Sequence, residues 1–115
     1  MEHHMKLNNE PFQQIKNGSK TIEIRLHDEK RQQVRANDII IFSHIEDKNK
    51  TIKVKVKETV EFPSFQALLK HYTNEEIGAD EDTQLSQNLA SLYNIYNQRD
   101  ELEYGVLAIN IRLIK

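Results

Sequence analysis

Strict alternation of apolar and charged side chains is the feature that most limits how this chain can fold. In TIKVKVKETV, residues 51–60, three branched apolar residues alternate with Lys53, Lys55 and Lys57. Successive side chains of a strand point to opposite faces of a sheet, so this period of two predicts a strand with one buried and one charged face. The segment TIEIRLH, residues 21–27, has the same period. The chain therefore needs a sheet with its core on one side.

Two further segments have the length and composition of strands. One is the apolar run DIIIFSH at residues 38–44. The other is YGVLAINIRLI at residues 104–114, in which the large apolar residues Leu107, Ile109, Ile111 and Leu113 occupy every second position and so lie on one face of a strand. The polar residues 46–50 between two of the strands predict a hairpin loop. The lysine row of residues 53–57 fits a solvated or edge-protecting face, and it also fits a strip that faces phosphates.

Two helices are predicted outside these strands. Pro11 suits a first helical position and Gly18 a left-handed helix end, which predicts a helix over residues 10–17. Ser64 can cap a second helix, because apolar residues follow it at helical spacing. These residues are Phe65, Leu68, Leu69 and Tyr72.

A third helix is predicted over residues 82–96, where leucines recur at helical spacing. The acidic residues 80–82 lie where this helix would begin and match the positive end of its dipole. Strands before and after a pair of helices, without regular βαβ units, predict an α+β fold. We expect a small, mostly antiparallel curled sheet or barrel with flanking helices.

The composition is typical of one globular domain spanning residues 1–115. The chain has 37% hydrophobic and 30% charged residues and no cysteine, which excludes a disulfide framework. Nothing resembles a signal peptide or a membrane-spanning run, so a cytoplasmic protein without a membrane partner is expected. The start MEHHMKL could be the remainder of a tag, and we expect it to be native. The five histidines lack metal-ligand spacing, so neither a metal nor a cofactor is predicted.

Charge is divided unevenly along the chain. The net charge of −2 argues against a protein that coats nucleic acid indiscriminately. Residues 1–60 nevertheless carry 12 Lys or Arg against 9 Asp or Glu, whereas residues 61–115 carry 4 against 9. The two parts are thus +3 and −5, which permits a local basic surface that faces an anion.

The segment GSKTIEIR, residues 18–25, resembles the ASCH domain family, which has the signature G-x-K-x-x-E-x-R. The similarity extends through DEKR at 28–31, the Asn-Asp pair at 37–38 and the Tyr-Gly-Val at 104–106. The resemblance implies a PUA-like β-barrel and binding of RNA or a nucleotide. It also implies a cleft beside the barrel, near Lys20, Glu23 and Arg25.

One bacterial branch of that family is similar to amidohydrolases that remove the acetyl group of N4-acetylcytidine. There a Thr three residues after the Lys is the proposed nucleophile, and here that position is Glu23. Thr21 falls two residues too early. The branch's catalytic Glu could correspond to Glu75. The candidate catalytic residues are therefore Lys20, Glu23 and Glu75, and whether the chain is an enzyme stays open.

Each member of the signature has a structural and a functional interpretation. Lys20 is either a surface lysine after a helix end, or a general base or a cation that holds a phosphate or carbonyl oxygen. Glu23 and Arg25 share a strand face and could simply pair with each other. Alternatively, Glu23 could accept from a base amine and Arg25 could grip phosphate or stack on a base.

Residues outside the signature supply further candidates. Lys30 and Arg31 are either solvated turn residues or phosphate contacts. Tyr93 and Tyr96 are either residues at the edge of the core or a surface on which a base stacks. The candidate ligand-binding residues are Lys20, Glu23, Arg25, Lys30, Arg31 and Tyr96.

Three functions remain compatible with the sequence. The first is a module that binds RNA or a nucleotide, recognising single-stranded or modified bases. The second is a small amidohydrolase that acts on a modified nucleoside, with Lys20 as base or electrostatic stabiliser and Glu23 or Glu75 activating water. The third is a protein-interaction domain on the same scaffold.

Overall fold

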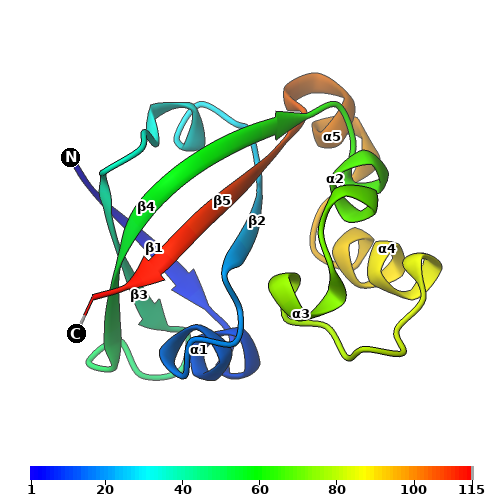
Figure 1. The fold of residues 1–115 in the computed structure, drawn as a ribbon. Helices are drawn as coiled ribbons and strands as arrows, with labels where there is room; N and C mark the ends of the chain where they lie inside the picture. The colour runs from blue at the N-terminus through cyan, green and yellow to red at the C-terminus, as the bar shows by residue number, and fades with distance from the viewer. Residues whose placement is uncertain (115) are drawn as a thin grey trace.

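Five strands form one curled sheet in the order β1-β3-β4-β5-β2 (Figure 1). The structure, a computed structural model, describes residues 1–114. β1 pairs with β3 in parallel, and the other three pairs are antiparallel. The predicted α+β fold with a mostly antiparallel curled sheet is thus confirmed. The strands are β1 (Glu2–Leu7), β2 (Ile22–Leu26), β3 (Ile39–His44), β4 (Thr51–Phe62) and β5 (Val106–Leu113).

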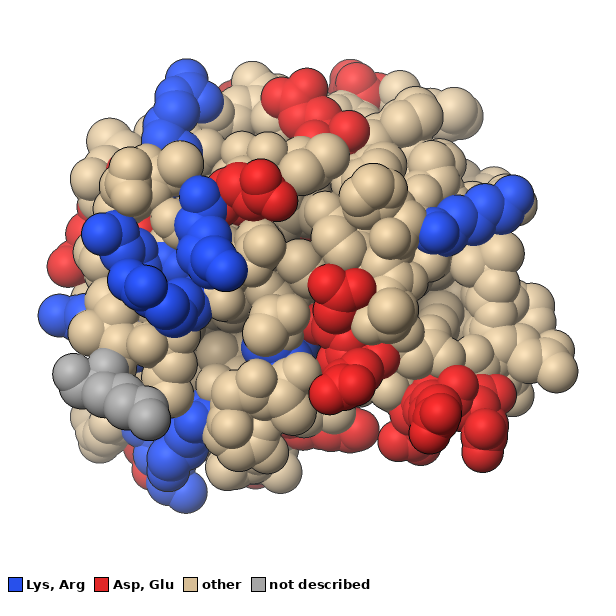
Figure 2. Space-filling model, viewed as in Figure 1, with Lys and Arg blue, Asp and Glu red and all other residues tan. Residues whose placement is uncertain are grey.

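The alternating segment 51–60 forms most of β4 and has the predicted two faces. Ile52, Val54 and Val56 are buried in the core inside the curl. Lys53 and Lys57 are exposed, and Lys55 lies opposite Arg112 of β5. Figure 2 shows Lys and Arg gathered on the side of the molecule where β4 and β5 lie. Since β4 lies between β3 and β5, the interpretation of the lysine row as edge protection is wrong. The exposed side chains fit a solvated face, and the strip that faces phosphates stays a prediction.

The first strand was absent from the sequence-based prediction. Along β1 the side chains of His3, Met5 and Leu7 are buried and the intervening ones are exposed. A histidine occupies a core position there, which hides the apolar alternation. His3 is accommodated because its Nε2 lies 2.8 Å from Asp38 Oδ2, so the buried polar ring has a partner.

The helix α1 (Asn9–Lys16) follows β1 directly and confirms the helix predicted over residues 10–17. Phe12 and Ile15 lie one turn apart on its buried face. Both belong to the hydrophobic core inside the curled sheet. A short 3-10 helix at Arg31–Gln33 connects β2 to β3.

Four helices lie between β4 and β5 in the chain and stand together beside the sheet (Figure 1). They are α2 (Phe65–His71), α3 (Asn74–Ile77), α4 (Leu85–Tyr93) and α5 (Gln98–Tyr104). Ser64 caps α2 as predicted, accepting a hydrogen bond from the backbone N–H of Ala67. A second core joins this layer to β2 and β5 through Ile22, Phe65, Leu68 and Val106.

The helix predicted over residues 82–96 is shorter in the structure, because α4 begins at Leu85 with Gln84 as its N-cap. Residues 80–82 lie in the preceding turn, and the first turn of α4 has no acidic residue, so their assignment to the helix dipole is wrong. The helix α5 was not predicted, and it lies just before the segment predicted as the last strand, sharing only Tyr104 with it. Among residues 1–114, no helix has the length and apolar character needed to cross a membrane.

The sequence of α5 lacks an apolar face because its buried residue is a carboxylate. Glu101 is 6% exposed and accepts hydrogen bonds from Phe65 N and the Tyr93 hydroxyl, both at 2.7 Å. Phe65 N is one of the N–H groups at the start of α2 that have no partner within the helix. The bond from Tyr93, together with burial and the charge of Glu101, raises the pKa of the Tyr93 hydroxyl. One side chain thus joins α2, α4 and α5.

We predict that Glu101→Ala lowers the free energy of unfolding by roughly 2–4 kcal/mol, because two donors lose their acceptor and each costs about 1–3 kcal/mol if left unpaired. Urea denaturation measures the change. Glu103→Ala on the same helix, where the side chain is exposed, is the matched control. Equal stability of the two variants would contradict the role assigned to Glu101.

Candidate functional site

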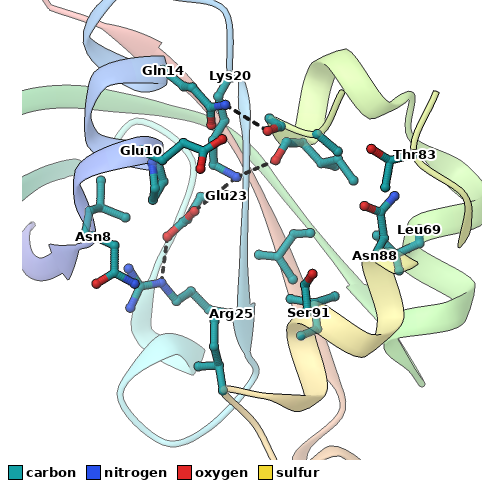
Figure 3. A pocket seen from close by; sticks show the side chains of 18 of the residues that line it. Asn8, Glu10, Gln14, Lys20, Glu23, Arg25, Leu69, Thr83, Asn88 and Ser91 are labelled. Carbon is teal, nitrogen blue, oxygen red and sulfur yellow. Dashed lines mark hydrogen bonds and ion pairs between the residues drawn. The ribbon is translucent and has the colours of Figure 1, made fainter. Parts of the chain in front are cut away.

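A cavity of about 480 Å³ lies between the sheet edge at β2, the start of α1 and the helical layer (Figure 3). A volume of this size is within the range of small-molecule sites. One wall carries charged residues from the segment before and along β2, and the opposite wall is formed by α4 and the loop that leads to it. The polar lining residues include Asn8, Glu10, Gln14, Lys20, Glu23, Arg25, Thr83, Asn88, Ser91 and Tyr96.

Three charged side chains form a continuous row on the first wall. Lys20 Nζ lies 3.5 Å from Glu23 Oε1, and Arg25 Nε donates to Glu23 Oε2 at 2.8 Å. Lys20 is 7% exposed and Glu23 is 5% exposed. The row therefore combines the two sequence interpretations, since the residues pair with one another and also line a cavity. Its net charge is positive, because two cations share one carboxylate.

The two cations are held by backbone carbonyls as well. Lys20 Nζ donates to the Ile77 carbonyl at 2.8 Å, and Arg25 Nη2 donates to the Lys6 carbonyl at 2.9 Å. Ile77 belongs to α3 and Lys6 to β1. The row thus connects β2 both to the helical layer and to the strand at the other edge of the sheet.

Burial and mutual charge shift the ionisation of this row. Burial lowers the pKa of the Lys20 ammonium, and Glu23 offsets only part of that effect. For Glu23, burial by itself raises the pKa, but the charges of Lys20 and Arg25 and the hydrogen bonds from both outweigh it. The pKa of the Glu23 carboxyl consequently lies below its ordinary value. The carboxylate stays ionised, and Lys20 releases its proton more readily than a surface lysine.

Gly78 closes the end of the cavity next to Lys20. Its φ of +84° is in the left-handed region that favours glycine. A Cβ at this position would collide with Gln14 Oε1 and would lie 3.0 Å from Lys20 Cδ. The Gly78 carbonyl also accepts a hydrogen bond from Gln14 Nε2 at 2.9 Å. Glycine therefore lets α1 and the Lys20 side chain approach the end of α3.

Tyr96 also lines the cavity, as the sequence predicted for a residue of the site. Its ring stacks on Phe65 with centroids 5.4 Å apart and an interplanar angle of 26°. Burial is the main cause of the raised pKa of its hydroxyl. Tyr93 takes the core-edge role instead, because it bonds to Glu101 and does not line the cavity.

Three predicted residues lie away from the cavity. Lys30 is exposed, and Arg31 pairs with Asp28 at 3.1 Å. Glu75 is exposed on α3 and does not line the cavity; it lines an adjoining depression that shares Gly78 and Asp80 with the cavity. The structure thus brings together Lys20, Glu23, Arg25 and Tyr96, whereas the roles of Lys30, Arg31 and Glu75 stay predictions without support from the cavity.

The wall formed by α4 was missed by sequence reasoning. Asn88 and Ser91 lie three residues apart among the leucines of α4 and interrupt its apolar pattern, which was the available signal. Thr83 precedes that helix and lines the same wall. Among residues 1–114, no group of three or more His, Cys, Asp or Glu side chains is arranged to hold a metal ion.

Comparisons with known proteins agree on the family and the fold. Residues 5–115 match the family model described as the ASCH domain. The crystal structure of hypothetical protein PH0355 is 36% identical with a TM-score of 0.85, over 99% of this chain and 100% of that chain. The solution NMR structure of protein PF0455 from Pyrococcus furiosus is 31% identical with a TM-score of 0.76, over 100% of this chain and 99% of that chain. No curated protein matches the chain.

We predict that Glu23→Gln destabilises the fold above about pH 4.5, where the wild-type carboxylate is ionised between two cations. A carboxyl group with a lowered pKa stabilises the folded state above its unfolded pKa, and this contribution is lost as pH falls through its folded pKa. The difference in unfolding free energy between wild type and variant should therefore shrink as pH falls below about 4.5.

Chemical denaturation at a series of pH values measures this difference. Glu75→Gln, at an exposed position of α3, is the matched control and should show little difference at any pH. A difference for Glu23→Gln that does not change with pH would contradict the assigned ionisation of the row.

Proposed function

The chain belongs to the ASCH domain family, and on that premise we propose that it binds a base of single-stranded RNA, or a nucleotide, in the cavity between β2 and α4. The observation that carries the proposal is the charged row of buried Lys20, buried Glu23 and partly exposed Arg25, which lines a cavity of suitable size. Ionisable groups with shifted pKa values in a cavity mark candidate functional sites.

Burial of the charges in this row carries a desolvation cost, which is a reason to seek a role for the row. Removing charges from water costs several kcal/mol per ion, and attraction between the charges does not always compensate. Lys20 and Arg25 retain N–H donors beyond those that bond Glu23 and the two carbonyls, since an ammonium has three and a guanidinium five. These donors, with the net positive charge of the row, suit a phosphate or a base carbonyl.

The shape of the site favours an unpaired base over a duplex. An RNA duplex hides its base edges in a deep and narrow groove, whereas an unpaired base can enter a cavity. Tyr96 and the exposed Ile95, which also line the cavity, supply apolar surface against which a base can pack. The lysine row of β4 does not line this cavity, so the proposal does not depend on it.

We predict that Arg25→Ala weakens binding of short single-stranded RNA at least about tenfold, because a lost hydrogen bond to a charged group is worth about 1.5–3 kcal/mol. Fluorescence anisotropy with labelled oligonucleotides measures the change. Arg25 also donates to the Lys6 carbonyl, so Arg25→Lys is included as a variant that keeps the positive charge. Its affinity for RNA should lie between that of the wild-type protein and that of Arg25→Ala.

Arg99→Ala, at an exposed position of α5, is the control that removes one positive charge elsewhere. If Arg25→Ala is folded and binds as tightly as Arg99→Ala, then Arg25 is not part of the site. Absence of binding to any single-stranded RNA or nucleotide by the wild-type protein would refute the proposed function.

A second function, hydrolysis of a modified nucleoside amide, is favoured by one observation. Lys20 is buried at the cavity with a lowered pKa and lies next to a carboxylate, which suits a general base. In this proposal neutral Lys20 takes a proton from a water molecule while the oxygen of that water attacks the amide carbonyl. The resulting ammonium then protonates the leaving amine, and the products are a carboxylic acid and the free nucleoside. Glu23 would stabilise the protonated lysine.

For this second function we predict that wild-type protein releases cytidine from N4-acetylcytidine and that Lys20→Ala does not. A chromatographic time course with purified proteins measures the product. Glu75→Gln should keep the wild-type rate, because Glu75 lies outside the cavity. Equal turnover by wild type and Lys20→Ala would refute this mechanism, and no turnover by either would leave binding as the function.

A further inference from the structure

Two asparagines on the helical side of the cavity form a pair whose orientation is determined by the backbone around them. The side-chain Nδ2 of Asn74 donates to the carbonyls of Asp80, Glu81 and Thr83, at 3.0, 3.1 and 2.8 Å. Three carbonyl oxygens around one end of an amide require that end to be the NH₂ group. The Oδ1 of Asn74 therefore has to point the other way.

The side-chain amide of Asn88 is hydrogen-bonded to that of Asn74. Its Nδ2 donates to Asn74 Oδ1 at 3.0 Å, so the orientation of Asn74 determines that of Asn88. The remaining end of the Asn88 side chain is its carbonyl oxygen, which accepts no hydrogen bond from residues 1–114. Asn88 lines the cavity (Figure 3). The wall formed by α4 thus presents a hydrogen-bond acceptor whose direction is set by Asn74.

The opposite wall has the reverse character. Lys20 and Arg25 present donors there, and Figure 3 shows them across the cavity from Asn88. A ligand that spans the cavity therefore needs acceptors or negative charge toward β2 and an N–H donor toward α4. Nucleobases differ in this property, since an exocyclic amino group donates whereas an oxo group at the same position only accepts.

We propose that Asn88, held in place by the positioning residue Asn74, makes the cavity select a base with an amino group over the corresponding oxo base. This inference rests on the proposed binding function and adds the chemical class of the ligand. An oxo group facing Asn88 Oδ1 would place two acceptors together, and once the ligand excludes water neither acceptor would have a donor. The site therefore distinguishes cytosine from uracil, or adenine from hypoxanthine.

Isothermal titration of the wild-type protein with two matched pairs of nucleotides tests the inference. The pairs are cytidine and uridine 5′-monophosphates, and adenosine and inosine 5′-monophosphates. In whichever pair binds, we expect the nucleotide with the amino group to bind about tenfold more tightly than its oxo counterpart. A tenfold ratio corresponds to about 1.4 kcal/mol, which is the size of effect expected from one well-placed contact. Equal binding or preference for the oxo member overturns the inference and leaves the binding function standing. No binding of any of the four refutes nucleotide recognition by the cavity.

Variants then assign the selectivity to the two asparagines. Asn88→Leu removes the acceptor, and Asn74→Ala frees the Asn88 amide to rotate, so both should bring the ratio of the two affinities close to one. In the double variant Asn74→Ala/Asn88→Asp both ends of the side chain at position 88 accept, so preference for the amino base should return. A purely structural role of Asn74 would not be rescued in this way.

Asn94→Ala is the matched control, because Asn94 is exposed at the end of α4 and does not line the cavity. It should keep the wild-type ratio. Retention of full selectivity by folded Asn88→Leu, or its loss in Asn94→Ala, would also overturn the inference. Thermal unfolding of each variant identifies any that fail to fold, and for these the smaller truncation Asn88→Ala supplies the decisive ratio. Without an acceptor at position 88, the two affinities should become nearly equal, and full selectivity of folded Asn88→Ala would overturn the inference.

Discussion

The arrangement of strands and helices in this domain depends on one interaction: the Glu23 carboxylate forms ion pairs with Lys20 on one side and Arg25 on the other. β1 and β2 are the two edges of the sheet, with three strands between them in the hydrogen-bonding order. Arg25 of β2 nevertheless donates to the Lys6 carbonyl of β1, so the curl of the sheet brings its edges together at the row. Lys20 bonds the Ile77 carbonyl, which attaches the helical layer at the same place. An edge strand that is covered in this way is also protected from pairing with other chains.

The same charges hold the elements together and set the electrostatic character of the cavity. Two cations and one carboxylate leave a net positive charge and unused N–H donors at the cavity, while their mutual contacts offset part of the cost of burial. Water and salt would screen the same charges on an exposed surface, whereas they screen the charges of this largely buried row much less. If this cavity binds the proposed ligand, loss of a charge from the row should therefore change stability and binding together. Substitutions on the opposite wall, formed by α4, separate the two effects more cleanly.

Much of the fold follows from local patterns, and particular residues show where those patterns stop being informative. The alternation in β4 and the apolar run in β3 predicted strands, and Ser64 predicted the start of α2. β1 and α5 escaped prediction because each buries a polar residue where the pattern expects an apolar one. His3 is paired with Asp38, and Glu101 with Phe65 and Tyr93. Asp38 is 35 residues from His3, and Phe65 is 36 residues from Glu101. A short stretch of sequence around either buried residue therefore does not contain the partner that makes its burial possible.

By itself, the sequence determined the α+β class, the strands at β2 to β5 and the grouping of Lys20, Glu23 and Arg25, because residues two or three apart on one strand and the turn before it are neighbours whatever the rest of the chain does. Only the tertiary structure decided what faces them. The wall opposite comes from α4, more than sixty residues later, and the orientation of Asn88 depends on three carbonyls of a loop held by Asn74. Hydrogen-bond direction in a cavity is a property of groups brought together by packing, and spacing along the chain does not encode it.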